Sequence, residues 1–423
     1  MKILIISHNA LSTYNNMGKT LLSLFSAFPR EQLCQIFVHP ALPDAGACES
    51  YWRITDKQVL KSLLTFSVPG GAVAEDAANH APAQANANQA AGRTKPLARL
   101  GRDLMWKLSR WNGAALNKWL DAQAPDVIFL APGYAKFIYD IALKISRSRK
   151  IPIVTYICDD YYFVEKPKGP LARLQHFLLR RKMDKLFRET AHLVGICPEI
   201  LAPYTQKFGV EGTVLMTGAS FTAQRRPEHG GVGAVFRYFG NIGCNRYINL
   251  ARLGETLDEI NRDTGKAHRL EIYTGEHREE IMARFRDIAS VTVSGFIAPG
   301  DVKRKTLEAD FVVHTEAFDP QSIDLVKNSV STKIADSLAC GIPLIAYGPA
   351  EVASMAHLIR HDCAFIATSP QQLRPMLDKA LSDGHYFQKI VDNALQTARD
   401  CHDAETNSRK LMEILQKAGA AHE

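Results

Sequence analysis

The segment at residues 329–349, SVSTKIADSLACGIPLIAYGP, places a hydroxyl group, a cation and a carboxylate close together in the chain. Ser331 is a good N-cap for a helix that would begin at Thr332. The N–H groups in the first turn of such a helix carry partial positive charge, and Lys333 adds a full charge at the same end. Asp336 lies on the adjoining face, where its carboxylate could accept hydrogen bonds from ribose hydroxyls. The segment therefore predicts a site for a diphosphate attached to a ribose.

A second group of candidates lies in the glycine-rich segment GNIGCNR, residues 240–246, which contains Asn241, Gly243 and Arg246. Cleavage of a sugar–phosphate bond leaves negative charge on the departing nucleotide diphosphate. Fixed positive charge from Arg246 and Lys333 would stabilise that charge. The alternative for Arg246 is an ordinary surface position at the start of the next helix.

Carboxylates at three positions could stabilise a positively charged sugar ring or accept a proton from the sugar acceptor. These are Asp159 and Asp160, in the segment CDDYY, and Glu316, in the segment TEAFD. The alternative is that these carboxylates only cap helices or brace loops.

The segment NNMGKTLL, residues 15–22, ends like a phosphate-binding P-loop, with Gly18 followed by Lys19 and Thr20. A complete P-loop needs glycine at both ends of a four-residue spacer, and the first of these positions is Thr13. We therefore do not expect a nucleoside triphosphatase. Gly18 is still a candidate phosphate contact near the start of a helix, and a role in the turn alone is the alternative.

Short runs rich in Ile, Val and Phe alternate with helix-like segments, which predicts an α/β fold with parallel sheets. Because ligands in such folds bind outside the carboxyl ends of the strands, all the candidates above are well placed for a cleft between two domains. The expected strands are 2–7, 34–39, 127–130, 153–157, 193–196, 235–239, 269–273, 291–294, 311–315, 344–347 and 364–367.

The irregular segment 217–234 predicts a boundary between a first domain, residues 1–217, and a second domain, residues 234–400, with a helical tail at 401–423. Residues 69–95 are rich in Ala, Asn and Gln and hold few large apolar side chains. Such a segment cannot bury enough surface to order itself, so we expect a mobile insertion in the first domain.

The composition is that of a globular chain of 423 residues with 46% hydrophobic residues and a formal net charge of +7. No apolar run reaches membrane-spanning length and no signal peptide is evident, so we expect a cytoplasmic protein. The eight cysteines are scattered without a C-x-x-C pair, which predicts neither a zinc site nor a disulfide framework. The small charge excess and the lack of a known module argue against nucleic-acid binding.

Two basic segments, residues 96–120 and 166–189, combine leucines at near-helical spacing with Arg, Lys and aromatic residues. Such helices can lie on anionic lipid at the inner-membrane surface. Ordinary domain helices with a solvated basic face are the alternative.

The chain resembles the GT-B glycosyltransferases of family four, in particular bacterial capsule and exopolysaccharide enzymes with the segment S-T-K-I-x-[DE]-x-[LM]-A-x-G-x-P. The resemblance extends over nearly the whole length, through NNMGKTLLSLF, IPIVTYICDDYY, GNIGCNR and TEAFD. It implies two facing Rossmann-like domains, of which the second binds a nucleotide-sugar and the first binds the acceptor. It also implies transfer with retention of configuration, without a metal and without a cofactor other than the donor substrate.

Carried over residue by residue, the resemblance gives Arg246 to the diphosphate and Asp336 to the ribose. Asn241 stands where many relatives have an arginine, and Lys333 is the candidate replacement. Glu316 is displaced from the usual position of the acid that contacts the sugar. Asp159 and Asp160 stand in the region where many relatives have a histidine. We expect the nucleotide base to be bordered by Gly275, Phe296 and Ile297.

The predicted function is transfer of a hexose from a nucleotide-diphosphate-sugar to a growing bacterial surface polysaccharide, with a lipid-linked or oligosaccharide acceptor. The expected location is the cytoplasm, with peripheral contact to the inner membrane. Two alternatives are open: an inactive nucleotide-binding partner of glycan-assembly enzymes, and a sugar-nucleotide epimerase.

Overall fold

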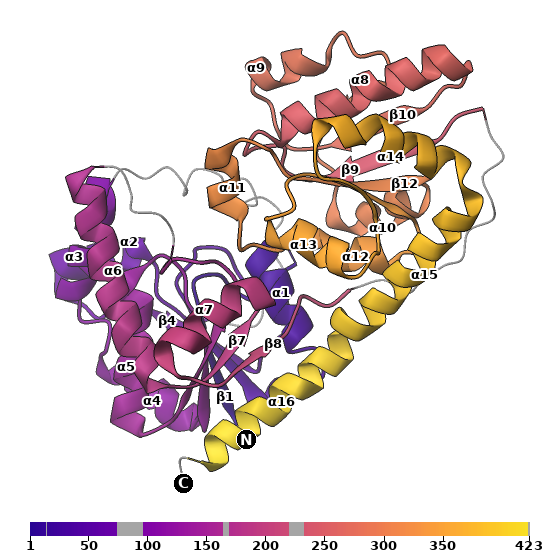
Figure 1. The fold of residues 1–423 in the computed structure, drawn as a ribbon. Helices are drawn as coiled ribbons and strands as arrows, with labels where there is room; N and C mark the ends of the chain where they lie inside the picture. Colours follow the sequence, from indigo (N-terminus) through magenta and orange to yellow (C-terminus); the bar gives the residue numbers. More distant parts are fainter. Residues whose placement is uncertain (14, 74–95, 164–168, 220–231, 422–423) are drawn as a thin grey trace. The chain divides into compact units, whose positions relative to one another are not determined.

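The computed structural model describes residues 1–13, 15–73, 96–163, 169–219 and 232–421. The chain divides into two compact units, and each is an α/β unit built on its own sheet (Figure 1). The first unit comprises Met1–Met216 together with Ala404–Glu423, and the second comprises Thr217–Asp403. The predicted α/β fold class is confirmed.

The first unit contains an eight-stranded sheet in the order β4-β3-β2-β1-β5-β6-β7-β8, parallel except where β4 pairs with β3. Its central strands are buried along their whole length, which explains their predominantly apolar sequences. The strands are β1 (Ile3–Ser7), β2 (Leu33–Phe37), β3 (Ser50–Arg53), β4 (Gly71–Ala72), β5 (Val127–Ala131), β6 (Ile153–Ile157), β7 (Thr190–Gly195) and β8 (Gly212–Val214).

Helices cover both faces of this sheet. Right-handed crossovers put α1 and α5 on opposite faces, because the chain leaves β1 and β5 in opposite directions across the sheet. Helix α16 packs on α1 and on β5, β6 and β7, so the last helix of the chain belongs to the first unit. The helices are α1 (Asn16–Leu24), η1 (Arg30–Gln32), α2 (Asp56–Thr65), α3 (Pro96–Leu108), α4 (Ala114–Gln123), α5 (Lys136–Arg149), α6 (Pro170–Glu189), α7 (Pro198–Phe208) and α16 (Ala404–Ala420).

The second unit contains a six-stranded sheet in the order β11-β10-β9-β12-β13-β14, and every pairing in it is parallel. Its strands are β9 (Val235–Phe239), β10 (Arg269–Tyr273), β11 (Val291–Ser294), β12 (Phe311–Thr315), β13 (Leu344–Tyr347) and β14 (Phe365–Ala367). Its helices are α8 (Arg246–Thr264), α9 (Glu279–Met282), η5 (Ala283–Phe285), α10 (Pro299–Leu307), α11 (Pro320–Val326), α12 (Lys333–Ala339), α13 (Ala353–Arg360), α14 (Pro370–Ser382) and α15 (Gly384–Cys401).

Every predicted strand has a counterpart, but some local predictions were wrong. Helix α12 begins at Lys333 with Thr332, not Ser331, as its N-cap residue, and no side chain caps this helix. Ser331 contributes only its carbonyl oxygen, which accepts a hydrogen bond from the Ile334 N–H at 3.0 Å. Gly18 does lie near the start of a helix, as expected: α1 begins at Asn16, and the Asn15 side chain caps it.

The predicted insertion at residues 69–95 is wrong at its start. Gly71–Ala72 forms β4 and pairs with β3, so the segment begins inside the first sheet. Residues 74–95 lie outside the described residues.

Candidate functional site

The carboxyl end of the second sheet has a topological switch point between β9 and β12. After β9 the chain crosses through α8 to β10 on one side, whereas β12 lies on the other side. Loops that diverge in this way leave a crevice at the ends of the two strands, which is the usual ligand site in open α/β sheets. The segment 240–246 follows β9, and Glu316 follows β12 directly.

The loop after β9 is shaped for close approach of a cation. Gly240 has a φ of +134°, and a Cβ at this position would lie 2.5 Å from the Lys333 Nζ atom. The positive φ favours glycine, because other residues adopt this backbone conformation only with strain, and the absence of a side chain lets the ammonium group of Lys333 lie against the loop. The loop is braced by Asn241, whose Oδ1 accepts a hydrogen bond from the Gly243 N–H at 2.6 Å. Lys333, the first residue of α12, is exposed.

Arg246 and Glu316 form an ion pair across the switch point. Arg246 is the first residue of α8, and its Nε lies 2.8 Å from Glu316 Oε2. The side chains are 18% and 5% exposed, respectively. The Asn249 side chain donates hydrogen bonds to the backbone oxygen of Glu316 at 2.7 Å and to Thr315 Oγ1 at 3.1 Å. The Glu316 carboxylate, itself held at the end of β12, therefore fixes the orientation of the Arg246 guanidinium.

The electrostatics of this cluster leave a net positive charge. Burial raises the pKa of Glu316, and the charges of Arg246 and Lys333 oppose that rise. Burial, with help from the same two cations, lowers the pKa of His314 to about 3, so this imidazole is neutral at pH 7. His314 Nε2 lies 3.1 Å from Ser354 Oγ and 3.9 Å from Glu316 Oε1.

The cluster can therefore hold an anion that approaches the Gly240 loop. Within the described part of the chain, Arg246 uses Nε for Glu316 and only a long 3.5 Å contact from Nη1 to the Gly243 oxygen. Its Nη2 atom has no hydrogen-bond partner among the described residues, so it can donate to a ligand oxygen. Phosphate oxygens suit such a planar donor edge.

The predicted ribose and base residues lie at neighbouring positions of the second unit. Asp336 is half-buried on α12, one turn after Lys333. Its negative charge partly opposes the lowering of the His402 pKa by burial, and His402 lies at the end of α15. Phe296 follows β11 and is 70% exposed, and a Cβ on Gly275 would lie 3.9 Å from its ring. Ile297 beside it is half-buried. An exposed ring beside a bare backbone segment offers one free face for a planar base.

The predicted carboxylates of the first unit differ from each other. Asp160 Oδ1 accepts three hydrogen bonds, from the N–H groups of Tyr162 and Phe163 at 2.9 Å and from the Tyr204 hydroxyl at 2.8 Å. This geometry favours the loop-bracing alternative for Asp160. Asp159 is exposed and accepts a hydrogen bond from the Tyr161 hydroxyl at 3.2 Å.

Gly18 is tightly packed in the first unit. Its N–H donates to Asn15 Oδ1 at 2.6 Å, so a phosphate would have to replace the helix cap. A Cβ on Gly18 would lie within 3 Å of the backbone of Ser12 and Ala10. The close approach of α1 to this loop explains the glycine without a ligand.

Sequence reasoning missed two histidines at strand ends. His314 lies in β12 beneath Glu316, and His8 follows β1, where the first sheet has its own switch point between β1 and β5. Burial lowers the pKa of His8 to about 4, and the charges of Arg102 and His39 act in the same direction. The only sequence signal for either residue was its place at the carboxyl end of an apolar run.

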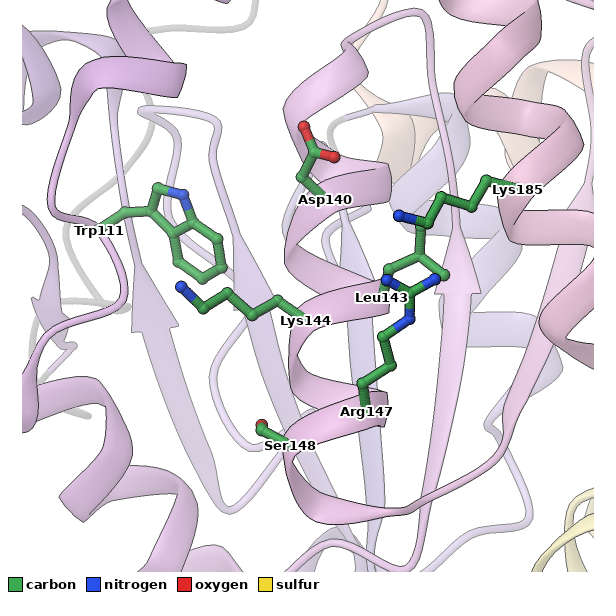
Figure 2. Close-up of a pocket in the computed structure, with 7 residues that line it drawn as sticks. All are labelled: Trp111, Asp140, Leu143, Lys144, Arg147, Ser148 and Lys185. Atoms are coloured by element: carbon green, nitrogen blue, oxygen red, sulfur yellow. The ribbon is translucent and has the colours of Figure 1, made fainter.

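A hollow of about 490 Å³ lies elsewhere on the first unit, between α5, α6 and the loop after α3 (Figure 2). Trp111, Lys144, Arg147 and Lys185 line it, together with Asp140, Leu143 and Ser148. Its lining comes from helix surfaces and includes none of the predicted site residues. Among the described residues, no group of three or more His, Cys, Asp or Glu side chains could hold a metal ion.

No protein-family model matches the sequence, and no curated protein matches it either. Solved structures do match over the full length of the chain. Anabaena HepE, in complex with UDP and glucose, is 15% identical with a TM-score of 0.62, covering 99% of this chain and 100% of that one. The chain has the GT-B glycosyltransferase fold.

Two further GT-B structures are similar to the same degree. Sucrose-phosphate synthase from Thermosynechococcus elongatus is 12% identical with a TM-score of 0.61, and 100% of both chains are covered. The UDP-forming trehalose-phosphate synthase from Burkholderia xenovorans, in complex with glucose-6-phosphate, is 10% identical with a TM-score of 0.62. That match covers 98% of this chain and 100% of the synthase. At such identities the likeness establishes the GT-B fold of the chain.

Proposed function

We propose that this protein is a retaining, metal-independent glycosyltransferase that uses a nucleotide-diphosphate-sugar and extends a lipid-linked bacterial surface glycan. The observation that carries the proposal is the convergence of Arg246 and Lys333 on the Gly240 loop at the switch point of the second sheet. HepE has the same fold and was solved with UDP and with UDP-glucose, which supports a donor of this class.

In this proposal the diphosphate lies against the Gly240–Gly243 backbone. The Lys333 ammonium group and Nη2 of Arg246 donate hydrogen bonds to the phosphate oxygens. They stabilise the negative charge that develops on the diphosphate when the bond to the sugar breaks. Glu316 keeps the guanidinium oriented through Nε. Asp336 binds the ribose, and Phe296 stacks on the base next to Gly275 and Ile297.

The carboxylate that acts on the sugar is assigned by elimination. Asp160 braces its own loop through three hydrogen bonds, so we assign it no role in the reaction. Asp159 is exposed at the end of β6 and can stabilise the ring cation or accept the acceptor's proton. Glu316 has a supporting role at the phosphates.

Lys333→Ala is the direct test, because Lys333 is exposed and the buried Glu316 keeps its ion pair with Arg246 in this variant. We expect affinity for UDP or GDP, measured by calorimetry, to fall roughly 10- to 100-fold, as for loss of a charged hydrogen bond. Lys266→Ala is the matched control, since Lys266 is an exposed lysine before β10, at the opposite end of the same sheet. Equal affinity in the Lys333→Ala and Lys266→Ala variants would refute the phosphate assignment.

The ion pair between Arg246 and Glu316 also favours a second candidate, a nucleotide-binding partner without turnover, because it neutralises one of the two cations. A panel of UDP- and GDP-sugars, incubated with and without lipid-linked acceptor, separates the two. Sugar release supports the transferase. Tight binding without release in every combination supports the inactive partner, and conversion of the donor without acceptor indicates an epimerase.

A further inference from the structure

Three helices of the first unit present large apolar side chains to solvent. Helix α3 packs against both α2 and α6, so the three are neighbours (Figure 1). Most of the exposed large apolar side chains in the described part of the chain lie on these helices or just after α2. They are Leu60, Leu64, Phe66, Val68, Leu97, Leu104, Leu108, Leu174 and Phe177.

Helix α3 is the clearest case. Leu97, Leu104 and Leu108 follow helical spacing on one face and are 71%, 56% and 62% exposed. The opposite face carries the contacts to the protein, where Trp106 is fully buried and stacks on Phe137 with ring centroids 3.8 Å apart. An amphipathic helix of a globular domain normally buries its apolar stripe. This helix has a filled inner face and a second, exposed stripe of leucines.

The polar side chains of α3 confirm this orientation. Arg102 Nε lies 2.9 Å from Asp56 on α2, and Asp103 pairs with Lys136 on α5 at 2.7 Å. Arg99 lies 4.7 Å from the centre of the Tyr134 ring. The alternative left open by the sequence was an ordinary helix with a solvated basic face. Such a helix would bury its leucines and expose its charged side chains.

Helix α6, which contacts α3, has a mixed stripe of exposed apolar and basic side chains. Leu174 and Phe177 are exposed near its start, and Arg181, Lys185 and Arg188 follow on the same face. The Arg181 guanidinium lies 5.8 Å from the centre of the Phe177 ring. None of the described carboxylates forms an ion pair with these three cations. On α2, the exposed Leu60 and Leu64 lie beside the exposed Lys57 and Lys61.

The hollow between α5 and α6 adds cations beside this stripe. Figure 2 shows the Arg147 guanidinium and the Lys185 ammonium on one side of the hollow, and Lys144 beside Trp111. The carboxylates nearby are engaged, since Asp140 pairs with Lys182 and Glu189 pairs with Arg147. A volume of about 490 Å³ is within the range that accepts a small ligand such as a lipid headgroup.

We propose that α2, α3 and α6 form a docking surface for an anionic membrane. The leucines and phenylalanines enter the boundary between headgroups and acyl chains, and the cations of α2 and α6 bind lipid phosphates. Charge complementarity selects this occupant, because the exposed apolar side chains alternate with cations that have no carboxylate partner among the described residues. This inference deepens the proposed function, since it would bring the acceptor-binding unit to a lipid-linked acceptor.

Vesicle co-sedimentation of the full chain tests the proposal. We expect binding to phosphatidylcholine vesicles that contain phosphatidylglycerol, weaker binding to phosphatidylcholine alone, and loss of the difference at high salt. Arg181→Glu combined with Lys185→Glu should weaken binding roughly 10-fold or more. The reason is that loss of a single cation near an anionic membrane surface weakens binding about five-fold. Leu104→Glu combined with Phe177→Glu should also weaken it.

Matched variants on the second unit provide the controls. Arg262→Glu combined with Lys266→Glu, and Ile359→Glu, change exposed residues of the same types and should bind vesicles like the wild type. Unaltered circular dichroism shows that each variant is folded. Equal loss in control and test variants would overturn the proposal, as would equal binding to both vesicle types.

A second copy of the chain is the rival occupant of this surface. Light scattering measures the oligomeric state. If the wild type is a dimer that does not bind vesicles, and the Leu104→Glu and Phe177→Glu substitutions dissociate this dimer, the membrane assignment is overturned. Calorimetry with UDP and GDP on the same variants separates this inference from the proposed function. Retained nucleotide affinity with lost vesicle binding confirms that the two sites are independent, whereas failure of vesicle binding in the wild type refutes only the docking surface.

Discussion

Asp160 and Glu316 both follow buried parallel strands, yet the two units use them differently. Asp160, after β6, accepts hydrogen bonds from two N–H groups of its own loop and from the Tyr204 hydroxyl, which are neutral donors. Glu316, after β12, is buried and meets the guanidinium of Arg246, which comes from a separate element. A carboxylate at a strand end is therefore a brace or part of a charged site according to the donors that the neighbouring elements bring to it.

The same contrast holds for the two switch points. The first sheet has a neutral histidine, His8, after β1, whereas the second sheet has a net positive cluster around the Gly240 loop. The charge difference indicates that the second unit is suited to an anionic ligand such as a diphosphate. The first unit has exposed cations on the outer surfaces of several helices, among them α2 and α6.

The largest expected effect comes from breaking the charged pair. Arg246→Ala leaves Glu316 buried without its partner, which should lower the free energy of unfolding by about 3–5 kcal/mol. Urea unfolding followed by circular dichroism measures this loss. Tryptophan emission serves as an internal reference, because all four tryptophans lie in the first unit.

A double variant separates stability from binding. Arg246→Ala combined with Glu316→Gln should recover much of the stability, because a neutral amide replaces the buried charge. Affinity for UDP or GDP should stay low, since the phosphate contact is still absent. Recovery of nucleotide affinity in the double variant would contradict the role of Arg246 as a phosphate ligand.

A smaller effect is expected for the brace in the first unit. Asp160→Ala leaves the Phe163 N–H and the Tyr204 hydroxyl without this acceptor, while the Tyr162 N–H keeps the Tyr204 hydroxyl oxygen at 3.2 Å, so the change should cost about 1–3 kcal/mol of stability. Nucleotide affinity should not change. Asp159→Ala is the matched comparison: we expect near-normal stability and reduced sugar transfer, and a stable, fully active Asp159→Ala variant would remove Asp159 from the reaction.

The smallest effect concerns acid. The pKa of His314 falls from an ordinary 6.5 to about 3 in the folded protein, so the unfolded chain binds the proton more tightly. Stability is therefore complete above pH 6.5 and declines as the pH falls below it, by about 1.4 kcal/mol per pH unit. His314→Gln should unfold with a flatter pH dependence than the wild type between pH 7.5 and about 5.5.

The same measurement distinguishes the units. His8→Gln should flatten the pH dependence of the tryptophan-detected transition, which reports the first unit. In the second unit, burial also lowers the pKa of His357 to about 3 and of His402 to about 4. An unchanged pH dependence in both glutamine variants would show that folding does not lower the pKa of either histidine.

The sequence by itself determined the main elements of both sheets. Parallel strands covered on both faces must be continuous apolar runs, so their positions are visible without any tertiary information. The strands that sequence reasoning missed, β3, β4 and β8, are short and lie toward the edges of the first sheet, where no such run is required. The candidate phosphate residues were also visible, because glycine-rich turns and a helix start have local signatures.

Only the tertiary structure decided how side chains from distant segments meet. Arg246 and Glu316 are 70 positions apart, and their pairing depends on the order of β9 and β12 in the sheet. In the same way, the leucines of α3 have a spacing that fits burial or exposure equally well. In the structure, the face of α3 that contains Trp106 packs against Phe137 in the core. The leucines lie on the opposite face of the helix and are therefore exposed to solvent.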